Sequence, residues 1–341
     1  MRAMIMAAGL GTRLRPITGE LPKPMVPVAG KPVMAHVVDL ARRHGLTEIA
    51  ANLHYLPDTI RGYFGDGGAD GVSLRWSLED ELLGTAGGVR NVADFLTEPG
   101  EPFVVLSADS LTDVDLGALV AAHRRAGNVA TLGLTAVEDP SDFGVVVVDG
   151  REQIVEFQEK PPLEEARSNL ASCGIYVFDP AIFDFVEPGF QDWAKDVFPR
   201  VLTSGRPFGG VLVRGYWNDV GSLGEYQSSN RDALLGTVAL ALPTDEIAEG
   251  VRAGRGVEVA GSAVLEGPIL LGDGVRIEDR AWIRGPATIS AGAVVGSGAA
   301  LRELNVWPGF RVPPSTVAVG GVLGDAAALA RAYASGERFG A

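Results

Sequence analysis

A glycine-containing loop near the amino terminus carries residues suited to binding phosphate groups. The loop follows a short apolar run and contains Gly9 and Gly11 together with Arg13 and Arg15. Glycines let backbone N–H groups approach an anion, and the two arginines add positive charge. No third glycine opens a helix here and no Gly-Lys-Ser/Thr follows, so neither the dinucleotide-binding fingerprint nor the P-loop motif fits. The loop therefore predicts an anion site outside these two motifs.

Lysine is scarce in this chain, which makes each lysine informative. Only four of the 29 basic residues are lysines: Lys23, Lys31, Lys160 and Lys195. Where arginine is the usual cation, a lysine is expected at places that need a compact ammonium rather than a planar guanidinium. Prolines flank Lys23 on both sides and stiffen its backbone, as holding one ammonium in place requires. Lys195 lies in a predicted surface helix, and we expect no role for it.

Strands and helices that could position these residues alternate over residues 1–236. The predicted strands are Met4–Ala8, Ile49–Leu53, Val72–Leu78 and Phe103–Leu106, and the predicted helices are Val33–Arg43, Asp58–Phe64, Gly88–Phe95 and Leu116–Ala126. Continuous apolar strands between helices predict an α/β fold with a Rossmann-like mixed, mostly parallel sheet covered on both faces. Asp149-Gly150 predicts a hairpin between Val145–Val148 and Gln153–Phe157, as an antiparallel edge or an insertion.

A repeat of period six follows near the carboxyl end. Its aliphatic positions are Val259, Leu265, Leu271, Ile277, Ile283, Ile289, Val295 and Leu301. This spacing is typical of a left-handed parallel β-helix built from hexapeptide repeats. Asp325 is expected to cap a short closing helix that runs to Ala334. We therefore expect a catalytic domain over 1–236, a linker over 237–256, a β-helix over 257–324 and a helix with a tail over 325–341.

The charge and cysteine content exclude several classes of partner. The net charge of −14 disfavours nucleic acid and anionic membrane surfaces as partners, although a small anion could still bind where cations converge. Cys173 is the single cysteine, which excludes an intrachain disulfide framework and fits a reducing compartment. The four histidines show no metal-ligand spacing, and no stretch of eighteen apolar residues occurs. We expect a soluble cytoplasmic protein.

The stretch Met6–Pro32 resembles the signature of the sugar-1-phosphate nucleotidylyltransferases. Further segments similar to that family follow in its order: Leu83–Gly88, Val105–Asp109, Phe157–Pro161, Gly174–Phe178 and Tyr216–Gly221. The resemblance covers about two thirds of the chain. The C-terminal repeat is also similar to that of family members such as the mannose-1-phosphate guanylyltransferases. The resemblance implies that a sugar 1-phosphate oxygen attacks the α-phosphorus of a nucleoside triphosphate in line and that pyrophosphate leaves.

The resemblance also implies roles for individual residues. Nucleotide contacts are expected from Ala8, Gly9, Gly11, Thr12, Arg13, Gly84, Thr85 and Gly87, and sugar-phosphate contacts from Gly144, Glu159, Lys160 and Ser172. Arg13 would contact the leaving pyrophosphate and Lys23 the reacting phosphates, while Lys160 would hold the sugar phosphate and Glu159 the sugar hydroxyls. Asp109 and Asp219 would hold Mg²⁺, which prefers one or two carboxylates plus phosphate oxygens. Arg13, Lys23, Asp109, Lys160 and Asp219 form the expected catalytic set.

Two departures from the family pattern bear on the substrate. Ser107-Ala108 stands where the family usually has Asn-Gly, and Ser172 stands where it usually has Asn. GTP with mannose 1-phosphate is our first choice of substrates, and glucose 1-phosphate with dTTP or UTP is the alternative. A non-catalytic subunit that senses a nucleotide sugar is disfavoured by the complete charged set. An acyltransferase is disfavoured because no histidine follows His123. We also expect the chain to form a homo-oligomer through the β-helix.

Overall fold

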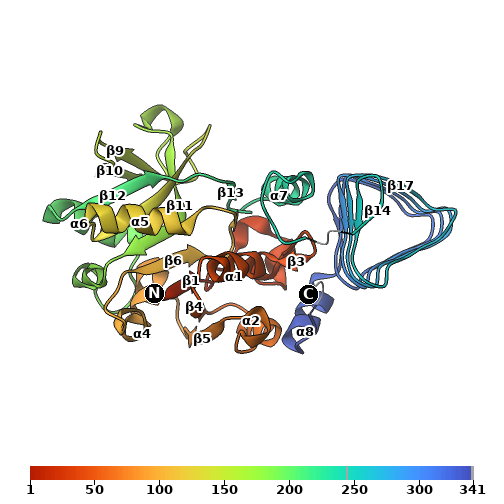
Figure 1. The fold of residues 1–341 in the computed structure, drawn as a ribbon, viewed down its shortest axis with the longest axis horizontal. Helices are drawn as coiled ribbons and strands as arrows, with labels where there is room; N and C mark the ends of the chain where they lie inside the picture. The colour runs from red at the N-terminus through yellow and green to blue at the C-terminus, as the bar shows by residue number, and fades with distance from the viewer. Residues whose placement is uncertain (243–244, 339–341) are drawn as a thin grey trace.

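The structure is a computed structural model that describes residues 1–242 and 245–338. An α/β domain occupies one end of the molecule and a stack of triangular coils the other (Figure 1). Helix α7 (Leu223–Leu235) and helix α8 (Ala326–Ala334) lie between these two parts. The predicted α/β domain and C-terminal β-helix are therefore both confirmed.

A mixed nine-stranded sheet forms the centre of the α/β domain, in the order β10-β9-β11-β6-β1-β4-β5 with β8 and β12 attached beside β11. Its parallel half consists of β1 (Ala3–Met6), β4 (Glu48–Leu53), β5 (Ser73–Leu78) and β6 (Phe103–Ser107). Its other strands are β8 (Ala130–Ala136), β9 (Gly144–Val148), β10 (Ile154–Glu159), β11 (Leu170–Phe178) and β12 (Phe208–Leu212). β9 and β10 pair antiparallel across the turn at Asp149, as predicted.

Helices cover both faces of this sheet, and neighbouring residues of β1 serve two different cores. Ile5 packs with α1 on one face and Met4 packs with α3 on the other. The helices are α1 (Val33–Arg43), α2 (Pro57–Phe64), α3 (Gly84–Arg90), α4 (Ala93–Thr97), α5 (Leu116–Ala126) and α6 (Phe198–Ser204). The predicted helix Gly88–Phe95 is two helices instead, because Val92 leaves the helical conformation (φ −117°, ψ 22°).

Short strands and helices lie in the connections between the longer elements. The two-residue strands are β2 (Pro27–Val28), β3 (Lys31–Pro32), β7 (Leu111–Thr112) and β13 (Trp217–Asn218). The short 3-10 helices are η1 (Thr12–Leu14), η2 (Ile17–Gly19), η3 (Lys23–Met25), η4 (Gly68–Asp70), η5 (Leu163–Glu165) and η6 (Pro180–Phe185), and η7 (Trp193–Val197) is a π-helix. β2 pairs with β3 and β7 pairs with β13, both antiparallel.

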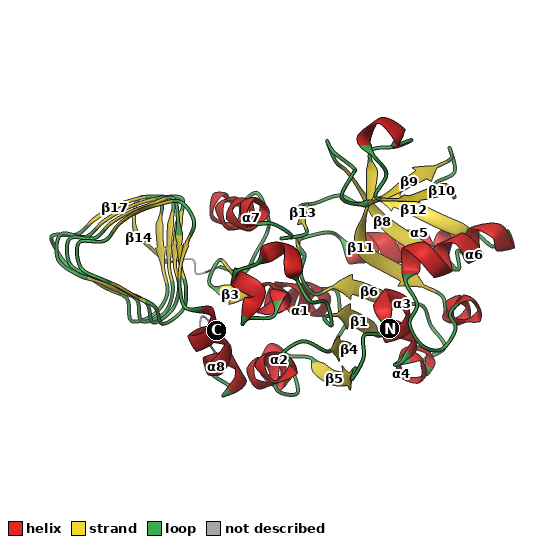
Figure 2. Ribbon diagram, turned by 180° about the vertical axis from the view of Figure 1, so that it is seen from behind, coloured by secondary structure: helices red, strands yellow, loops and turns green. Residues whose placement is uncertain are grey.

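The β-helix has three flat faces, each a sheet (Figure 2). Strands pair parallel from coil to coil, except that β14 pairs antiparallel with β15. One face contains β14 (Glu246–Ala248), β15 (Val251–Ala253), β18 (Ile269–Leu271), β21 (Ala287–Ile289), β24 (Asn305–Val306) and β27 (Val322–Leu323). The second contains β16 (Glu258–Val259), β19 (Arg276–Ile277), β22 (Val294–Val295) and β25 (Arg311–Val312). The third contains β17 (Val264–Glu266), β20 (Trp282–Arg284), β23 (Ala300–Arg302) and β26 (Val317–Val319).

The six-residue period corresponds to one face of each coil. The aliphatic residues from Leu271 to Leu301 that define the period are at most 1% exposed and fill the interior. The coils begin earlier than the boundary we expected at 257, because β14 and β15 lie in the segment predicted as a linker and β15 pairs with β18. They also continue past Leu301, where Val306 and Val312 take the buried positions.

The closing helix α8 is capped by the Asp325 side chain, as predicted, and packs back against α2. Tyr333 is fully buried, and its ring meets the ring of Tyr63 edge-on at 5.0 Å. Gly62 lies so close to the backbone carbonyls of Tyr333 and Ala334 that a Cβ at Gly62 would overlap them. The last three residues of the predicted tail, 339–341, fall outside the described residues.

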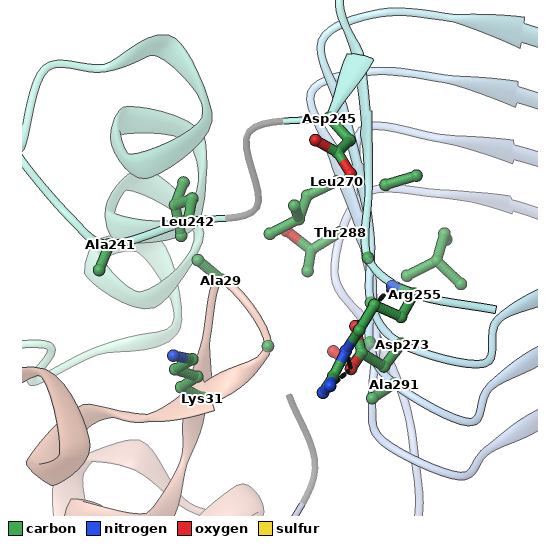
Figure 3. Close-up of a pocket in the computed structure, with 16 residues that line it drawn as sticks. Ala29, Lys31, Ala241, Leu242, Asp245, Arg255, Leu270, Asp273, Thr288 and Ala291 are labelled. Carbon is green, nitrogen blue, oxygen red and sulfur yellow. Dashed lines mark hydrogen bonds and ion pairs between the residues drawn. The ribbon is translucent and has the colours of Figure 1, made fainter. Parts of the chain in front are cut away.

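A cavity of about 360 Å³ separates part of the α/β domain from the β-helix (Figure 3). Ala29 and Lys31 line it on one side, and Leu270 and Thr288 line it on the other. An ion pair of 2.8 Å between Arg255 and Asp273 closes one edge. Within residues 1–242 and 245–338, no helix has the length and apolar character needed to cross a bilayer.

Candidate active site

Four members of the expected catalytic set meet in one charged cluster. The Lys23 Nζ donates to Oδ2 of Asp109 at 2.6 Å and to the backbone carbonyl of Asp219 at 2.8 Å. The Arg13 guanidinium donates to Oδ2 of Asp219 at 3.2 Å. Lys23 is 6% exposed whereas Arg13 is exposed, so the cluster has a buried cation at its base and a solvent-facing cation at its rim. Each cation thus pairs with one carboxylate, and the backbone of Asp219 connects the two pairs.

The β7–β13 pairing brings Asp219 to Asp109. Asn218 pairs with Leu111, so the residues that follow β13 lie beside those that precede β7. The chain then turns sharply at Val220, whose φ of +47° is uncommon for a β-branched residue. The Val220 N–H donates to the Asn218 side chain at 2.8 Å, and the Gly221 N–H donates to Oδ1 of Asp219 at 3.2 Å. These bonds fix the orientation of the Asp219 carboxylate.

Gly11 lets the amino-terminal loop cross directly over Lys23. Its φ is +60°, and a Cβ at this position would lie 2.7 Å from the Cβ of Lys23. The loop is held there by Thr18, whose hydroxyl donates to the Gly11 carbonyl at 2.7 Å. Glycine is therefore required at position 11 both by its backbone conformation and by the close approach. Ala8, Gly9 and Thr12 lie in the same loop, and their contacts with a nucleotide stay a prediction.

Two buried polar residues that we did not predict connect the loops around this cluster. Asn52, at the end of β4, accepts from the Ala7 N–H at 2.9 Å and donates to Oε1 of Glu79 at 2.8 Å. The other Glu79 oxygen accepts from the Leu83 N–H at 3.0 Å. Both side chains are at most 5% exposed, and a Cβ at Gly88 would overlap them. A polar asparagine inside the apolar run Ile49–Leu53 was the signal that could have revealed this pair.

The segment Gly84–Gly87 binds another part of the protein through its polar groups. The Thr85 hydroxyl donates to Asp192 at 3.0 Å and accepts from the Trp193 N–H at 2.9 Å. The Gln191 carbonyl accepts from the N–H groups of Ala86 and Gly87 at 2.8 and 3.1 Å. Gly84 and Gly87 have no room for a Cβ beside this segment. Nucleotide contacts from Gly84, Thr85 and Gly87 stay a prediction.

The expected sugar-phosphate residues Glu159 and Lys160 lie at the end of β10. Glu159 pairs with Gly144 across the hairpin, and the Lys160 N–H donates to the Phe143 carbonyl at 3.0 Å. Lys160 has a φ of +48°, so the strand stops there and the chain turns. Burial, and then the nearby Asp192 carboxylate, raise the pKa of Glu159, while Lys160 and Lys195 oppose this rise.

Asp192 and Lys195 therefore lie near Glu159, and the absence of a role for Lys195 stays a prediction. Both come from the π-helix η7 and its preceding residue, and the Asp192 side chain accepts from the N–H groups of Ala194 and Lys195.

The two departures from the family pattern lie at the β6–β11 border. Gly174 interrupts β11 with a φ of +68°, and a Cβ there would lie 2.5 Å from the Ser107 Oγ. Ser172 lies two residues earlier on the same strand as Tyr176, whose pKa is raised to about 12 by burial. Ser107 and Ser172 are thus both on the strands that lead to the charged cluster.

The carboxylates of Asp109 and Asp219 fit a divalent cation only together with a substrate. In the part of the chain that the structure describes, no group of three or more His, Cys, Asp or Glu side chains could hold a metal. Two carboxylates are nevertheless the protein share that Mg²⁺ ordinarily takes when nucleotide phosphates supply further oxygens. The donor set therefore fits a metal–nucleotide complex better than an independent metal site.

Comparison with known proteins agrees with this geometry. The sequence model of the family described as "Nucleotidyl transferase" matches residues 2–234. The chain is similar to the UTP–glucose-1-phosphate uridylyltransferase of Synechocystis sp., with 37% identity over 92% of this chain and 84% of that protein. It is also similar to the mannose-1-phosphate guanylyltransferase of Mycobacterium tuberculosis, with 31% identity over 81% of each chain.

A solved structure shows the same likeness in three dimensions. It is a Bacillus anthracis protein in complex with sucrose, provisionally named a glucose-1-phosphate thymidylyltransferase. The TM-score is 0.62 at 27% identity, over 71% of this chain and 97% of that one. Since the family model matches most of the chain and curated relatives align along both of its domains, this chain belongs to the nucleotidyl transferase family and is a sugar-1-phosphate nucleotidylyltransferase.

Proposed function

We propose that this enzyme transfers a nucleoside monophosphate from a Mg²⁺–nucleoside triphosphate to a sugar 1-phosphate at the Lys23–Asp109–Asp219 cluster. The observation that carries the proposal is the buried Lys23 ammonium, held between Asp109 and Asp219 beneath the glycine loop. The two cations can neutralise negative charge on the two polyanionic substrates and the charge that grows between them, and the two carboxylates can hold a further cation there. Asp109 and Asp219 are the residues that would hold Mg²⁺, which supplies charge neutralisation at the phosphates when bound.

The reaction forms one bond at the α-phosphorus and breaks another. An oxygen of the sugar 1-phosphate attacks the α-phosphorus, and the bond to the bridging oxygen of the β-phosphate breaks as pyrophosphate leaves. Arg13, at the exposed rim, would accompany the leaving pyrophosphate, and Lys23 would contact the reacting phosphates. Lys160 would hold the sugar phosphate and Glu159 the sugar hydroxyls. The chain needs only to position and neutralise, and the one cysteine is buried with a raised pKa.

GTP and mannose 1-phosphate are the substrate pair we propose first. The basis is the sequence Pro-Lys-Pro-Met-Val-Pro-Val at 22–28 together with the β-helix. A second pair, UTP and glucose 1-phosphate, is favoured by the 37% identity to the Synechocystis uridylyltransferase over 92% of the chain. Ser107 and Ser172 are the residues we expect to influence this choice, because they replace asparagine of the family pattern at strands next to the cluster.

A panel of nucleoside triphosphates against sugar 1-phosphates tests the proposal by pyrophosphate release. We expect one pair to exceed all others in kcat/KM and to require Mg²⁺. Nucleotide-sugar product must appear in equal amount to pyrophosphate. Pyrophosphate release that does not depend on any sugar 1-phosphate would contradict the proposal, since it would indicate hydrolysis. If UTP with glucose 1-phosphate is best, the second pair replaces the first.

We also propose that the chain forms a homo-oligomer through the β-helix. Val317 and Val319, on the last strand of the third face, are 78 and 64% exposed, and Val264, on the first strand of that face, is 49% exposed. Exposed aliphatic side chains of this kind favour a protein interface. Light scattering of the full chain should give the mass of an oligomer. Replacing Val317 and Val319 with aspartate should reduce that mass, and an unchanged mass would exclude this face as the interface.

A further inference from the structure

A chain of buried hydrogen bonds connects the β-helix to the α/β domain. The Trp307 Nε1 in the β-helix donates to the Tyr226 hydroxyl at 2.9 Å. The Tyr226 hydroxyl in turn donates to the backbone carbonyl of Pro27 at 2.8 Å. Tyr226 is fully buried and Trp307 is 3% exposed, so water does not compete for these groups. The tyrosine hydroxyl uses its proton and a lone pair to join two parts of the molecule that are far apart in sequence.

A local shift in the β-helix delivers Trp307 to this position. Interior residues follow each other at six-residue steps as far as Leu301, but the next one, Val306, comes after only five. Trp307 therefore stands at the position that Gly272 and Ser290 have in the two preceding coils, so these three residues lie one above the other in a column along the face. The next residue of that column is Gly324, where a Cβ would lie 2.7 Å from the indole. One large ring thus lies in a column of small residues and contacts α7.

The carbonyl that ends this chain belongs to the stretch that carries Lys23. Between Lys23 and Pro27 the backbone is stiff, because it contains two prolines and is bonded internally from the Val26 N–H to the Lys23 carbonyl at 3.1 Å. Asn230, one turn after Tyr226 on α7, accepts from the Ala29 N–H at 2.9 Å. Helix α7 therefore holds this stretch at two points.

The same helix begins immediately after Asp219. Ser222 caps α7, accepting from the Glu225 N–H at 3.2 Å, and only Val220 and Gly221 separate the cap from Asp219. A small rotation of α7 would therefore move Asp219 and the Lys23 stretch together. Lys23 also donates to the Asp219 carbonyl. Helix α7 therefore supports both Lys23 and Asp219.

We propose that Trp307 and Tyr226 are positioning residues for nucleotidyl transfer, through which the β-helix fixes the placement of Lys23 and Asp219 relative to the rest of the active site. The inference rests on the proposed function of that cluster. It gives the β-helix a part in catalysis that does not require any of its residues to touch a substrate. Displacements well below the size of an atom at reacting groups are enough to slow an enzyme many-fold.

The test removes one hydrogen-bonding group at a time; Tyr226→Phe keeps the ring, and Trp307→Phe keeps an aromatic side chain that is smaller than the indole. Tyr226→Phe deletes the relay hydroxyl, and Trp307→Phe deletes the donor. We expect each to lower kcat roughly tenfold while the KM values for both substrates change less than about threefold. The double variant should be no slower than either single variant, because each substitution breaks the same chain. A merely structural role would lower the melting temperature and leave kcat unchanged.

Trp282→Phe is the matched control. Trp282 also lies in the β-helix and also donates its Nε1, to Glu266 at 2.9 Å, but on the face with exposed valines. It should retain the kcat of the unmodified enzyme. The proposal is overturned if Tyr226→Phe and Trp307→Phe keep kcat within twofold, or if Trp282→Phe lowers it equally. If Tyr226→Phe does not fold, Trp307→Phe alone decides. Failure of the proposed function is separate, since the unmodified chain would then make no nucleotide sugar.

Discussion

At the scale of single residues, the cluster is defined by how little room Lys23 has. Its ammonium lies between the Asp109 carboxylate and the Asp219 carbonyl, and Gly11 covers its stem. A flat guanidinium needs more width and forms bonds in a fixed plane. The chain, which otherwise uses mostly arginine, therefore has a lysine at a position where only the shape of an ammonium group fits.

Lys23→Arg should reduce kcat by about a hundredfold or more although it keeps the charge, because the fork cannot occupy the same space. Steady-state kinetics check this. Lys31→Arg, at the edge of the interdomain cavity in Figure 3, is the control and should behave like the unmodified enzyme. Equal behaviour of the two variants would contradict the prediction. Lys195 is a less suitable control, because it lies near Glu159.

Asp109→Asn and Asp219→Asn should each lower kcat by about a hundredfold or more, since each removes a charge that stabilises the transition state. Raising Mg²⁺ should not restore the rate fully. The control Asp58→Asn changes a carboxylate that is 86% exposed on α2 and should have no effect on rate. Near-normal rates in both active-site variants at low Mg²⁺ would exclude these residues as the metal ligands.

Site residues could be predicted from the sequence where the family pattern consists of charged side chains. The sequence led to Arg13, Lys23, Asp109 and Asp219, and the structure brings these four together. Asn52 and Glu79 escaped prediction because their role is to bond to other parts of the protein, and such partners are distant in sequence. Asp192 escaped for the same reason.

At the scale of elements, two buried histidines connect helices to strands. The ring of His36 on α1 hydrogen-bonds the Val28 carbonyl of β2 at 2.9 Å, and the ring of His123 on α5 bonds Thr131 of β8 at 2.9 Å. Burial lowers the pKa of each to about 4. Both side chains are therefore neutral at neutral pH, and each contributes to attaching a helix to its neighbouring strand.

The free energy of unfolding should fall as the pH drops from about 6.5 to about 4. In this window the unfolded chain binds protons at both histidines and the folded chain does not, so acid favours unfolding. Each histidine contributes a loss on the order of a few kcal/mol by pH 4. Urea unfolding at several pH values measures the slope. His36→Gln and His123→Gln should each make it shallower, and an unchanged slope in the double variant would disprove the explanation.

Helices and strands could be predicted where the spacing of hydrophobic residues alone specifies them. α1 and α5 have the predicted bounds because their apolar spacing and terminal signals agree. The helix expected at Gly88–Phe95 differs, because α3 begins earlier through bonds to Gln191 that the local sequence does not show. The β-helix coils after Leu301 do not continue the six-residue period, because the next interior residue, Val306, follows Leu301 after five residues instead of six.

At the scale of the whole molecule, the two domains share one core. Leu270 and Trp307 of the β-helix and Leu329 and Tyr333 after it pack into the same apolar cluster as α1 and α2. A domain boundary at 236 therefore agrees with the change in sequence pattern, but the hydrophobic core continues across it. A chain ending at Gly236 would expose this surface, so we expect it to be less stable than the full chain.

Gly62→Ala should lower the free energy of unfolding by about 1–3 kcal/mol, because the new methyl would push α8 away from α2. Thermal or urea unfolding measures the loss. Gly224→Ala is the matched control on α7, where the nearest side-chain atom is 3.9 Å away and the added methyl should stabilise by up to about 1 kcal/mol. If Gly62→Ala is as stable as Gly224→Ala, α8 does not depend on this contact.

The contacts of Trp307 and α8 also restrict how the β-helix can change in length. Trp307 and Gly324 are ladder neighbours one coil apart, and α8 starts two residues after Gly324. A whole coil inserted between them would carry α8 about 4.8 Å from its seat on α2, which is the spacing of adjacent strands. A coil added before β15 would leave both contacts in place. Homologous chains should therefore lengthen at the first coil and keep a constant count of residues from the tryptophan to the closing helix.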